Sequence, residues 1–156
     1  LPPLKDKLRD KIQRAEHLSD TVKSAVLAHL NKLPDGTSVC HGDFHPENIL
    51  VDGNDAKVID WVDASQGDPM ADVARTYILL TVGNIQGTLR TRFMLGSARN
   101  VFNRLYLRHY FALRGGSYKA VQAWFVPMAA GRLSEGVESP ELFVNMVMQG
   151  LRHEAG

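Results

Sequence analysis

The stretch His41-Gly42-Asp43-Phe44-His45-Pro46-Glu47-Asn48 (HGDFHPEN, residues 41–48) places two histidines, two acids and an asparagine between short apolar runs. Gly42 and Pro46 favour a loop over a continuous strand at this position. A loop with so many carboxylate, imidazole and amide groups can bind a metal ion, support phosphoryl transfer, or form a solvated turn. The segments on either side of the loop decide among these three interpretations.

Two short segments rich in β-branched residues follow the loop, in the stretch ILVDGNDAKVID (residues 49–60). They flank Asp52-Gly53-Asn54-Asp55, a tight-turn signal, so we expect an antiparallel β-hairpin. Such a hairpin returns Asp60 to the neighbourhood of Asn48, while a turn through Pro46 can bring Asp43 to the same cleft. Carboxylate and amide oxygens are the ligands that Mg²⁺ prefers, and phosphoryl transfer also needs a carboxylate that orients the attacking hydroxyl.

The rest of the chain has helical periodicity, and we expect a mainly α (α+β) domain that carries this small hairpin. One helix is predicted over residues 3–17, and a second from a cap at Ser19 or Asp20 to the turn at residues 33–36. Later helices are predicted over residues 69–82, 88–113, 117–133 (kinked at Pro127) and 140–155, the last with Ser139 as its N-cap.

Bulk composition excludes several classes of function. The chain has 156 residues, 44% of them hydrophobic, which fits one domain with a substantial core. A formal net charge of +1 with scattered Lys and Arg gives no nucleic-acid footprint. No apolar run approaches the roughly 20 residues of a membrane span. Cys40 is the only cysteine, so no intramolecular disulfide is possible, which favours a reducing, cytoplasmic location.

Three motifs together resemble the aminoglycoside phosphotransferase family. HGDFHPEN is similar to the catalytic loop of that family and, more distantly, to the His-Arg-Asp…Asn loop of protein kinases. VIDW (residues 58–61) resembles the family's metal-binding Asp segment, and GDPMADVA (residues 67–74) resembles its Gly-Asp-Pro-x-x-Asp-hydrophobic-Ala motif. The motifs occur in family order over residues 41–74. The resemblance implies the helical C-terminal lobe of the protein-kinase-like fold.

The resemblance also implies roles for individual residues. Asp43 would be the catalytic carboxylate that orients the acceptor hydroxyl, and His45 could donate a hydrogen bond to the transferred phosphate. Asn48 and Asp60 would bind the Mg²⁺ that accompanies ATP or GTP. Structural support of the catalytic loop would come from His41, Asp68 and Asp72.

The implied acceptor is the hydroxyl group of a small molecule. A cationic acceptor would need acidic groups at the rim of the helical region, for which Glu135, Glu138 and Glu141 are the candidates. Family members often carry an acid directly after the IDW segment. Here Val62 stands at that position and Asp63 follows, so Asp63 is a further candidate for a substrate contact.

One part of the family pattern is missing. The family has two lobes, and its N-terminal sheet lobe supplies a nucleotide-covering loop and a lysine for the phosphates. No strand-rich stretch precedes the first predicted helix, and RGGSYK (residues 114–119) is not a P-loop. We therefore expect residues 1–156 to be the C-terminal lobe alone, a fragment whose partner is the missing N-terminal lobe.

Two other interpretations stay open. A lone helical lobe could be a non-catalytic binding module that keeps the motif. Alternatively, His41-x-Asp43-x-His45 alternates as metal ligands on one strand face would, and a Zn²⁺ or Mn²⁺ hydrolase could use such a set. The hydrolase interpretation leaves Asn48, Asp60 and GDPMAD unexplained.

Overall fold

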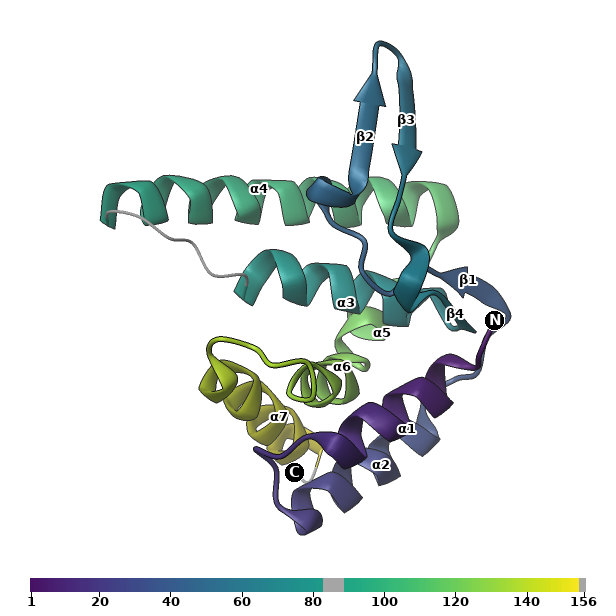
Figure 1. The fold of residues 1–156 in the computed structure, drawn as a ribbon, viewed down its shortest axis with the longest axis vertical. Helices are drawn as coiled ribbons and strands as arrows, with labels where there is room; N and C mark the ends of the chain where they lie inside the picture. Colours follow the sequence, from purple (N-terminus) through teal and green to yellow (C-terminus); the bar gives the residue numbers. More distant parts are fainter. Residues whose placement is uncertain (83–88, 155–156) are drawn as a thin grey trace.

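The computed structural model describes residues 1–82 and 89–154 of the chain (Figure 1). The elements in chain order are α1 (Leu4–Arg14), α2 (Asp20–Lys32), β1 (Ser38–Cys40), the 3-10 turn η1 (Pro46–Asn48), β2 (Ile49–Asp52), β3 (Asp55–Val58), the 3-10 turn η2 (Trp61–Asp63), β4 (Ser65–Gly67), α3 (Pro69–Val82), α4 (Leu89–Arg114), α5 (Tyr118–Gln122), α6 (Phe125–Arg132) and α7 (Pro140–Glu154). Helices predominate, so the mainly α prediction is confirmed.

The two N-terminal helices form where the sequence predicts them. α1 buries one stripe at helical spacing, made of Leu4, Leu8 and Ile12, and ends three residues earlier than expected. The Ser19 hydroxyl accepts a hydrogen bond from Val22 N at 3.4 Å, so Ser19 is the N-cap of α2. α2 ends at Lys32, directly before the predicted turn.

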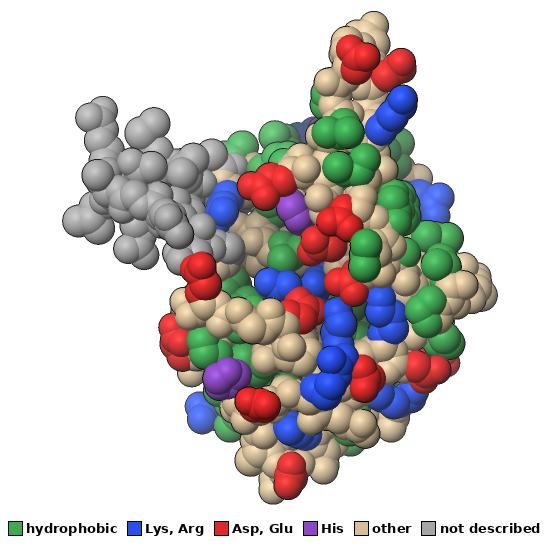
Figure 2. Space-filling view, viewed as in Figure 1, with side chains coloured by type: hydrophobic (Ala, Val, Ile, Leu, Met, Phe, Trp, Pro, Cys, Tyr) green, Lys and Arg blue, Asp and Glu red, His purple; other side chains and the backbone are tan. Residues whose placement is uncertain are grey.

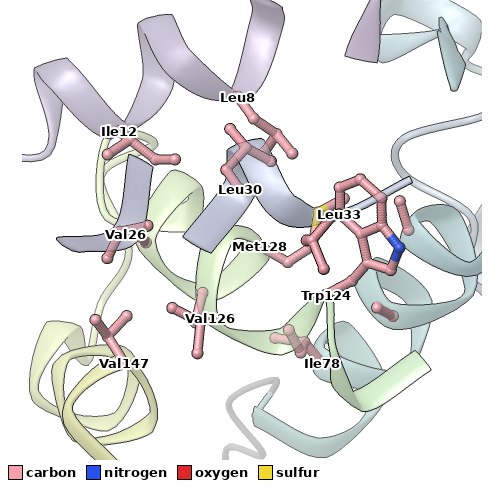
Figure 3. Close-up of a cluster of buried hydrophobic side chains, with 14 of the residues drawn as sticks. Leu8, Ile12, Val26, Leu30, Leu33, Ile78, Trp124, Val126, Met128 and Val147 are labelled. Carbon is pink, nitrogen blue, oxygen red and sulfur yellow. The ribbon is translucent and has the colours of Figure 1, made fainter. Parts of the chain in front are cut away.

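The core lies between α1, α2, α3, α6 and α7, with α6 at its centre (Figure 3). Trp124, just before α6, is 1% exposed, and Val126 and Met128 continue the buried face from there. Helices distant in sequence meet on α6, because both faces of this short helix are apolar. The core therefore connects the N-terminal helix pair to the C-terminal helix.

The predicted hairpin is present. β2 and β3 pair antiparallel with Asp52 opposite Asp55, so Gly53 and Asn54 form a two-residue turn. Gly53 has a φ of +60°, which a glycine adopts without steric cost. Figure 1 shows that this hairpin projects away from the helices.

A second two-stranded sheet was not predicted. β1 and β4 pair antiparallel, with Cys40 opposite Ser65. The β4 sequence Ser-Gln-Gly has neither alternation nor β-branched residues, so local propensity gives no strand signal there. The pairing closes the segment between the two strands, residues 41–64, into one protruding unit.

The predicted helix over residues 117–133 is divided into α5 and α6. The break lies at Ala123 and Trp124, before Pro127 rather than at it. Proline has no N–H and its ring clashes with the carbonyl four residues earlier, which here belongs to Ala123. Pro127 consequently occupies the first turn of a new helix, where proline is tolerated.

The remaining helices agree with prediction. α3 begins at Pro69 and ends at Val82, and α7 begins at Pro140. α4 covers the predicted range from Leu89 onward, whereas Thr88 lies outside the described residues. Within the part of the chain that the structure describes, no helix combines the length and the apolar character needed to cross a membrane.

Gly150 allows α7 to approach α6 closely. A Cβ at this position would overlap Val126 Cγ2, and valine has little rotamer freedom with which to move away. We predict that Gly150→Ala lowers the free energy of unfolding by about 1–2 kcal/mol, because overpacking outweighs the higher helix propensity of alanine. Urea unfolding would measure this. Asn145→Ala, at an exposed position of the same helix, is the control and should cause little change; higher stability of Gly150→Ala would contradict the prediction.

Candidate active site

One carboxylate holds the start of the polar loop. Asp72, in the first turn of α3, accepts a hydrogen bond from His41 N at 2.9 Å through Oδ2 and from Gly42 N at 2.7 Å through Oδ1. Gly42 has a φ of +82°, and a Cβ there would lie 2.6 Å from the Asp63 carbonyl oxygen. Only glycine fits this close approach. The first residues of the loop are therefore tied to α3.

His41 is buried, 3% exposed, and hydrogen-bonded through both ring nitrogens. Nδ1 accepts from Asp43 N at 3.2 Å, so Nε2 carries the proton and donates to Ile59 O at 2.9 Å. The ring also lies 4.5 Å from that of Trp61, centroid to centroid. These contacts connect the loop to the end of the hairpin.

The two hydrogen bonds of the His41 ring also argue against the metal-dependent hydrolase interpretation. With both nitrogens occupied by the protein, His41 cannot act as a metal ligand together with Asp43 and His45. Across residues 1–82 and 89–154, no group of three His, Cys, Asp or Glu side chains is placed to bind a metal ion. The alternating ligand set proposed for a Zn²⁺ site does not form.

Asp43, His45 and Asn48 converge at the tip of the loop. Asn48 Nδ2 donates to the Asp43 carbonyl at 2.9 Å and lies 3.4 Å from Asp43 Oδ2. His45 Nε2 lies 3.4 Å from the same Oδ2 and 3.2 Å from Asn48 Nδ2. Asn48 is 8% exposed, whereas the Asp43 side chain keeps 30% of its surface exposed. The Asn48 amide nitrogen faces Asp43, which leaves its oxygen as the atom available to a cation.

The hairpin brings Asp60 close to Asn48 through the backbone. Ile59 N donates to Asn48 O at 3.0 Å, and Asp60 follows directly. Asp60 has φ 62° and ψ 61°, and it is the only non-glycine residue with positive φ in the described part of the chain. Such a conformation costs free energy and persists only where surrounding contacts impose it. The Asp60 side chain is exposed to solvent.

Asp68 joins the site to the core. Its Oδ1 accepts from Met70 N at 2.9 Å, which caps the start of α3, and its Oδ2 accepts from the indole nitrogen of Trp124 at 3.2 Å. Asp68 thus positions the helix that carries Asp72.

Arg75 is a site residue that the sequence analysis missed. Its side chain is 6% exposed and forms a bidentate pair with Glu135, with Nη1–Oε1 at 2.9 Å and Nη2–Oε2 at 3.0 Å. Nη2 also lies 3.8 Å from Asp43 Oδ1 and 3.9 Å from Asp63 Oδ2. A charged residue in the apolar run MADVARTYILL, three positions after Asp72, was the available signal.

Two lysines of α1 extend this charge network. Lys7 Nζ and Lys11 Nζ each lie 3.3 Å from Asp63 Oδ1, and Lys11 Nζ lies 2.8 Å from Glu135 Oε1. Burial alone would raise the pKa of Asp63, but Lys11, Lys7 and Arg75 outweigh it and lower that pKa below its ordinary value. Figure 2 shows the resulting surface, with acidic side chains beside a band of Lys and Arg.

The predicted substrate-contact acids lie in different environments. Asp63 and Glu135 are bound by cations of the protein itself, and Arg132 also contacts Glu135. Glu138 lines a cavity of about 370 Å³ between α3 and the start of α7, and Glu141 is exposed in the first turn of α7. The carboxylates of Asp63 and Glu135 are thus already neutralised, which weakens the case for a cationic acceptor.

The charge network predicts how stability depends on pH. Burial would raise the pKa of Glu135, but hydrogen bonds and charge from Arg75, with Lys11 and Arg132, lower it from 4.5 to about 2. A carboxyl group whose pKa is lower in the folded than in the unfolded state stabilises the fold at pH values above its unfolded-state pKa. This stabilisation is lost as the pH falls toward the folded-state pKa. The ionised Glu135 should therefore contribute roughly 3 kcal/mol above about pH 5, lost progressively down to about pH 2.

We predict that Glu135→Gln is destabilised at pH 7 and that its deficit relative to the unmodified chain shrinks as pH falls from about 5 to 2. Urea unfolding at several pH values would measure the difference between the two proteins. The matched control is Glu141→Gln, which removes an exposed carboxylate and should show no such pH-dependent deficit. A constant deficit for Glu135→Gln over this range would contradict the assignment.

Comparison with known proteins supports a family assignment. No curated protein and no solved structure matches the chain. The family model described as the phosphotransferase enzyme family (APH) matches residues 2–112, which is more than half of the sequence and includes the loop, the hairpin and α3. This chain therefore belongs to the APH phosphotransferase family.

Proposed function

We propose that the chain carries the catalytic loop of a kinase that transfers the γ-phosphate of ATP, or of GTP, to a hydroxyl of a small molecule. The observation that carries the proposal is the convergence of Asp43, His45 and Asn48 on a loop anchored by Asp72. Phosphoryl transfer depends on positioning and electrostatics rather than on covalent catalysis, and this loop is held by hydrogen bonds at both ends.

In the proposed reaction the acceptor oxygen forms a bond to the γ-phosphorus as the bond to the β–γ bridging oxygen breaks. Asp43 orients the acceptor hydroxyl and receives its proton late in the transfer, since a carboxylate is a weak base. Asn48 holds the Asp43 backbone in place through its amide nitrogen. His45 contacts both side chains, and in this proposal it donates a hydrogen bond to the phosphate.

The donor set fits Mg²⁺. Asn48 Oδ1 and the Asp60 carboxylate are hard oxygen ligands, and Mg²⁺ is usually held by one or two protein groups together with phosphates and water. When bound, Mg²⁺ would neutralise part of the negative charge of the phosphates. Asn48 and Asp60 would hold it.

We further propose that residues 1–156 form the helical lobe of a kinase-like fold, with the nucleotide-covering part of the enzyme supplied from outside these residues. The helical content, the protruding hairpin and the family assignment support this. A cytoplasmic location is part of the proposal and is supported by the single, buried cysteine.

The acceptor is proposed to enter the cavity of about 480 Å³ beside His45. Among the residues that the structure describes, the lining includes the apolar side chains of Leu79, Leu80 and Phe102. The charged residues in it are one acid, Glu47, and one arginine, Arg99, beside His45. This balance suits an uncharged alcohol with an apolar body better than a polycation.

The site assignment predicts two classes of variant. Asn48→Ala and Asp60→Ala should weaken Mg²⁺-dependent ATP binding by about tenfold or more, because each removes a metal ligand. Asp43→Ala should leave ATP binding nearly unchanged and lower turnover at least a hundredfold in the enzyme that contains both lobes. Calorimetric titration of MgATP and steady-state kinetics measure the two effects. Asp55→Ala, in the hairpin strand β3, is the control.

Unchanged turnover in all three variants would refute the assignment. Absence of MgATP binding even by the two-lobed protein would favour a non-catalytic binding module.

The acceptor proposal makes a separate prediction. Phe102→Ala should raise the acceptor KM about tenfold through lost apolar contact, with little effect on ATP binding. Leu113→Ala, at an exposed position near the end of the same helix, is the control. A panel of neutral alcohols and of polyamines, assayed with both variants, measures this. A polyamine substrate whose KM is unaffected by Phe102→Ala would overturn the proposal for the acceptor but not that for the reaction.

A further inference from the structure

A small, partly open cavity borders Gly42 at the start of the catalytic loop. It has a volume of about 30 Å³ and is lined by apolar residues of α1 and α6, by Gly42 and Ser65, and by charged side chains of both signs: Lys7, Lys11, Arg75, Asp63 and Asp72. A volume of about 10–15 Å³ on this measure admits one water molecule. The cavity therefore has room for one or two.

Two buried polar atoms belong to residues on this cavity. Ser65 is 0% exposed and Arg75 is 5% exposed. Ser65 Oγ and Arg75 Nε have no hydrogen-bond partner among the protein atoms described. Buried polar groups in folded proteins are satisfied almost without exception, so both atoms need a partner from elsewhere. Their location on the same cavity indicates a shared partner.

The chemistry of the lining identifies that partner. Arg75 Nε–H is a donor, so its partner must accept, which excludes a metal cation. The cavity also borders Asp63 and Asp72, whose carboxylates accept hydrogen bonds, and Lys7 and Lys11, whose ammonium groups are already paired with Asp63 and Glu135. A halide could accept from Arg75 but could donate nothing to the carboxylates. Water accepts and donates, and satisfies both kinds of group.

We infer that ordered water occupies this cavity and joins Arg75 Nε and Ser65 Oγ to the Asp72 carboxylate, which anchors the catalytic loop. Ser65 is then a positioning residue. It acts through the water on Asp72, which holds the amides of His41 and Gly42. Its place on β4, opposite Cys40, puts it beside the strand that leads into the loop. This inference does not depend on the reaction that the loop catalyses.

A crystal structure of the chain at a resolution that shows ordered water tests the site directly. The expected result is density within hydrogen-bond distance of both Ser65 Oγ and Arg75 Nε, with no anomalous signal after a bromide soak. A cavity without density, or one that takes up bromide, would overturn the inference.

Amide hydrogen exchange tests the positioning role. Ser65→Ala removes the hydroxyl, and exchange at the Gly42 amide should become about five- to tenfold faster, since one bond of the network is lost. Ser38→Ala makes the same change on the paired strand β1, away from the cavity, and should leave Gly42 exchange unchanged. Equal exchange rates in the two variants would show that Ser65 has no positioning role even where water is present.

Discussion

The Asp72 carboxylate accepts hydrogen bonds from two consecutive backbone N–H groups, and the geometry of the site depends on this interaction. Asp72 can do this because α3 starts at a fixed place, and α3 starts there because Asp68 caps it. Asp68 in turn accepts from the indole of Trp124, a fully buried residue at the centre of the core. An unbroken series of contacts thus connects hydrophobic packing to the position of the polar loop at residues 41–48, and the closely packed core holds this loop in place.

The charge network adds a second connection, between segments far apart in the sequence. Arg75 is buried, and a buried guanidinium is tolerated only with partners. Glu135 supplies a bidentate pair, while Lys11 ties Glu135 and Asp63 to α1. The α1 helix and the turn before α7 are therefore connected to the loop through Arg75, which lies 3.8 Å from Asp43 Oδ1. Removing one partner would leave a buried charge poorly compensated, so this network stabilises the fold more than an exposed ion pair elsewhere does, such as Arg14–Asp10.

Local signals predicted much of this architecture, and long-range contacts account for what they missed. The apolar stripe of α1, the Ser19 cap and the hairpin turn at Gly53 depend on neighbouring residues, so the sequence shows them. β4 forms only because it pairs with β1, and a Ser-Gln-Gly segment carries no sign of that partner. Arg75 was missed for the same reason, because its importance comes from Glu135, 60 residues away. The same holds for Glu135, a candidate contact for a cationic acceptor, because its pairing with Lys11, Arg75 and Arg132 depends on long-range contacts.

The hydrogen-bond partners also separate the acidic residues into two groups. Asp68, Asp72 and Glu135 are bound by donors of the protein, so their charge is used to build the fold. Asp43 has only longer side-chain contacts, at 3.4 Å to Asn48 and His45 and 3.8 Å to Arg75, and keeps 30% of its side-chain surface exposed. Asp60 is exposed on a strained backbone beside it. A group whose charge is already satisfied gains little by binding a ligand, whereas one that faces solvent from a rigid position can bind a cation or orient a hydroxyl without reorganisation. The contacts of each carboxylate thus distinguish those that build the fold from those that stay accessible to a ligand.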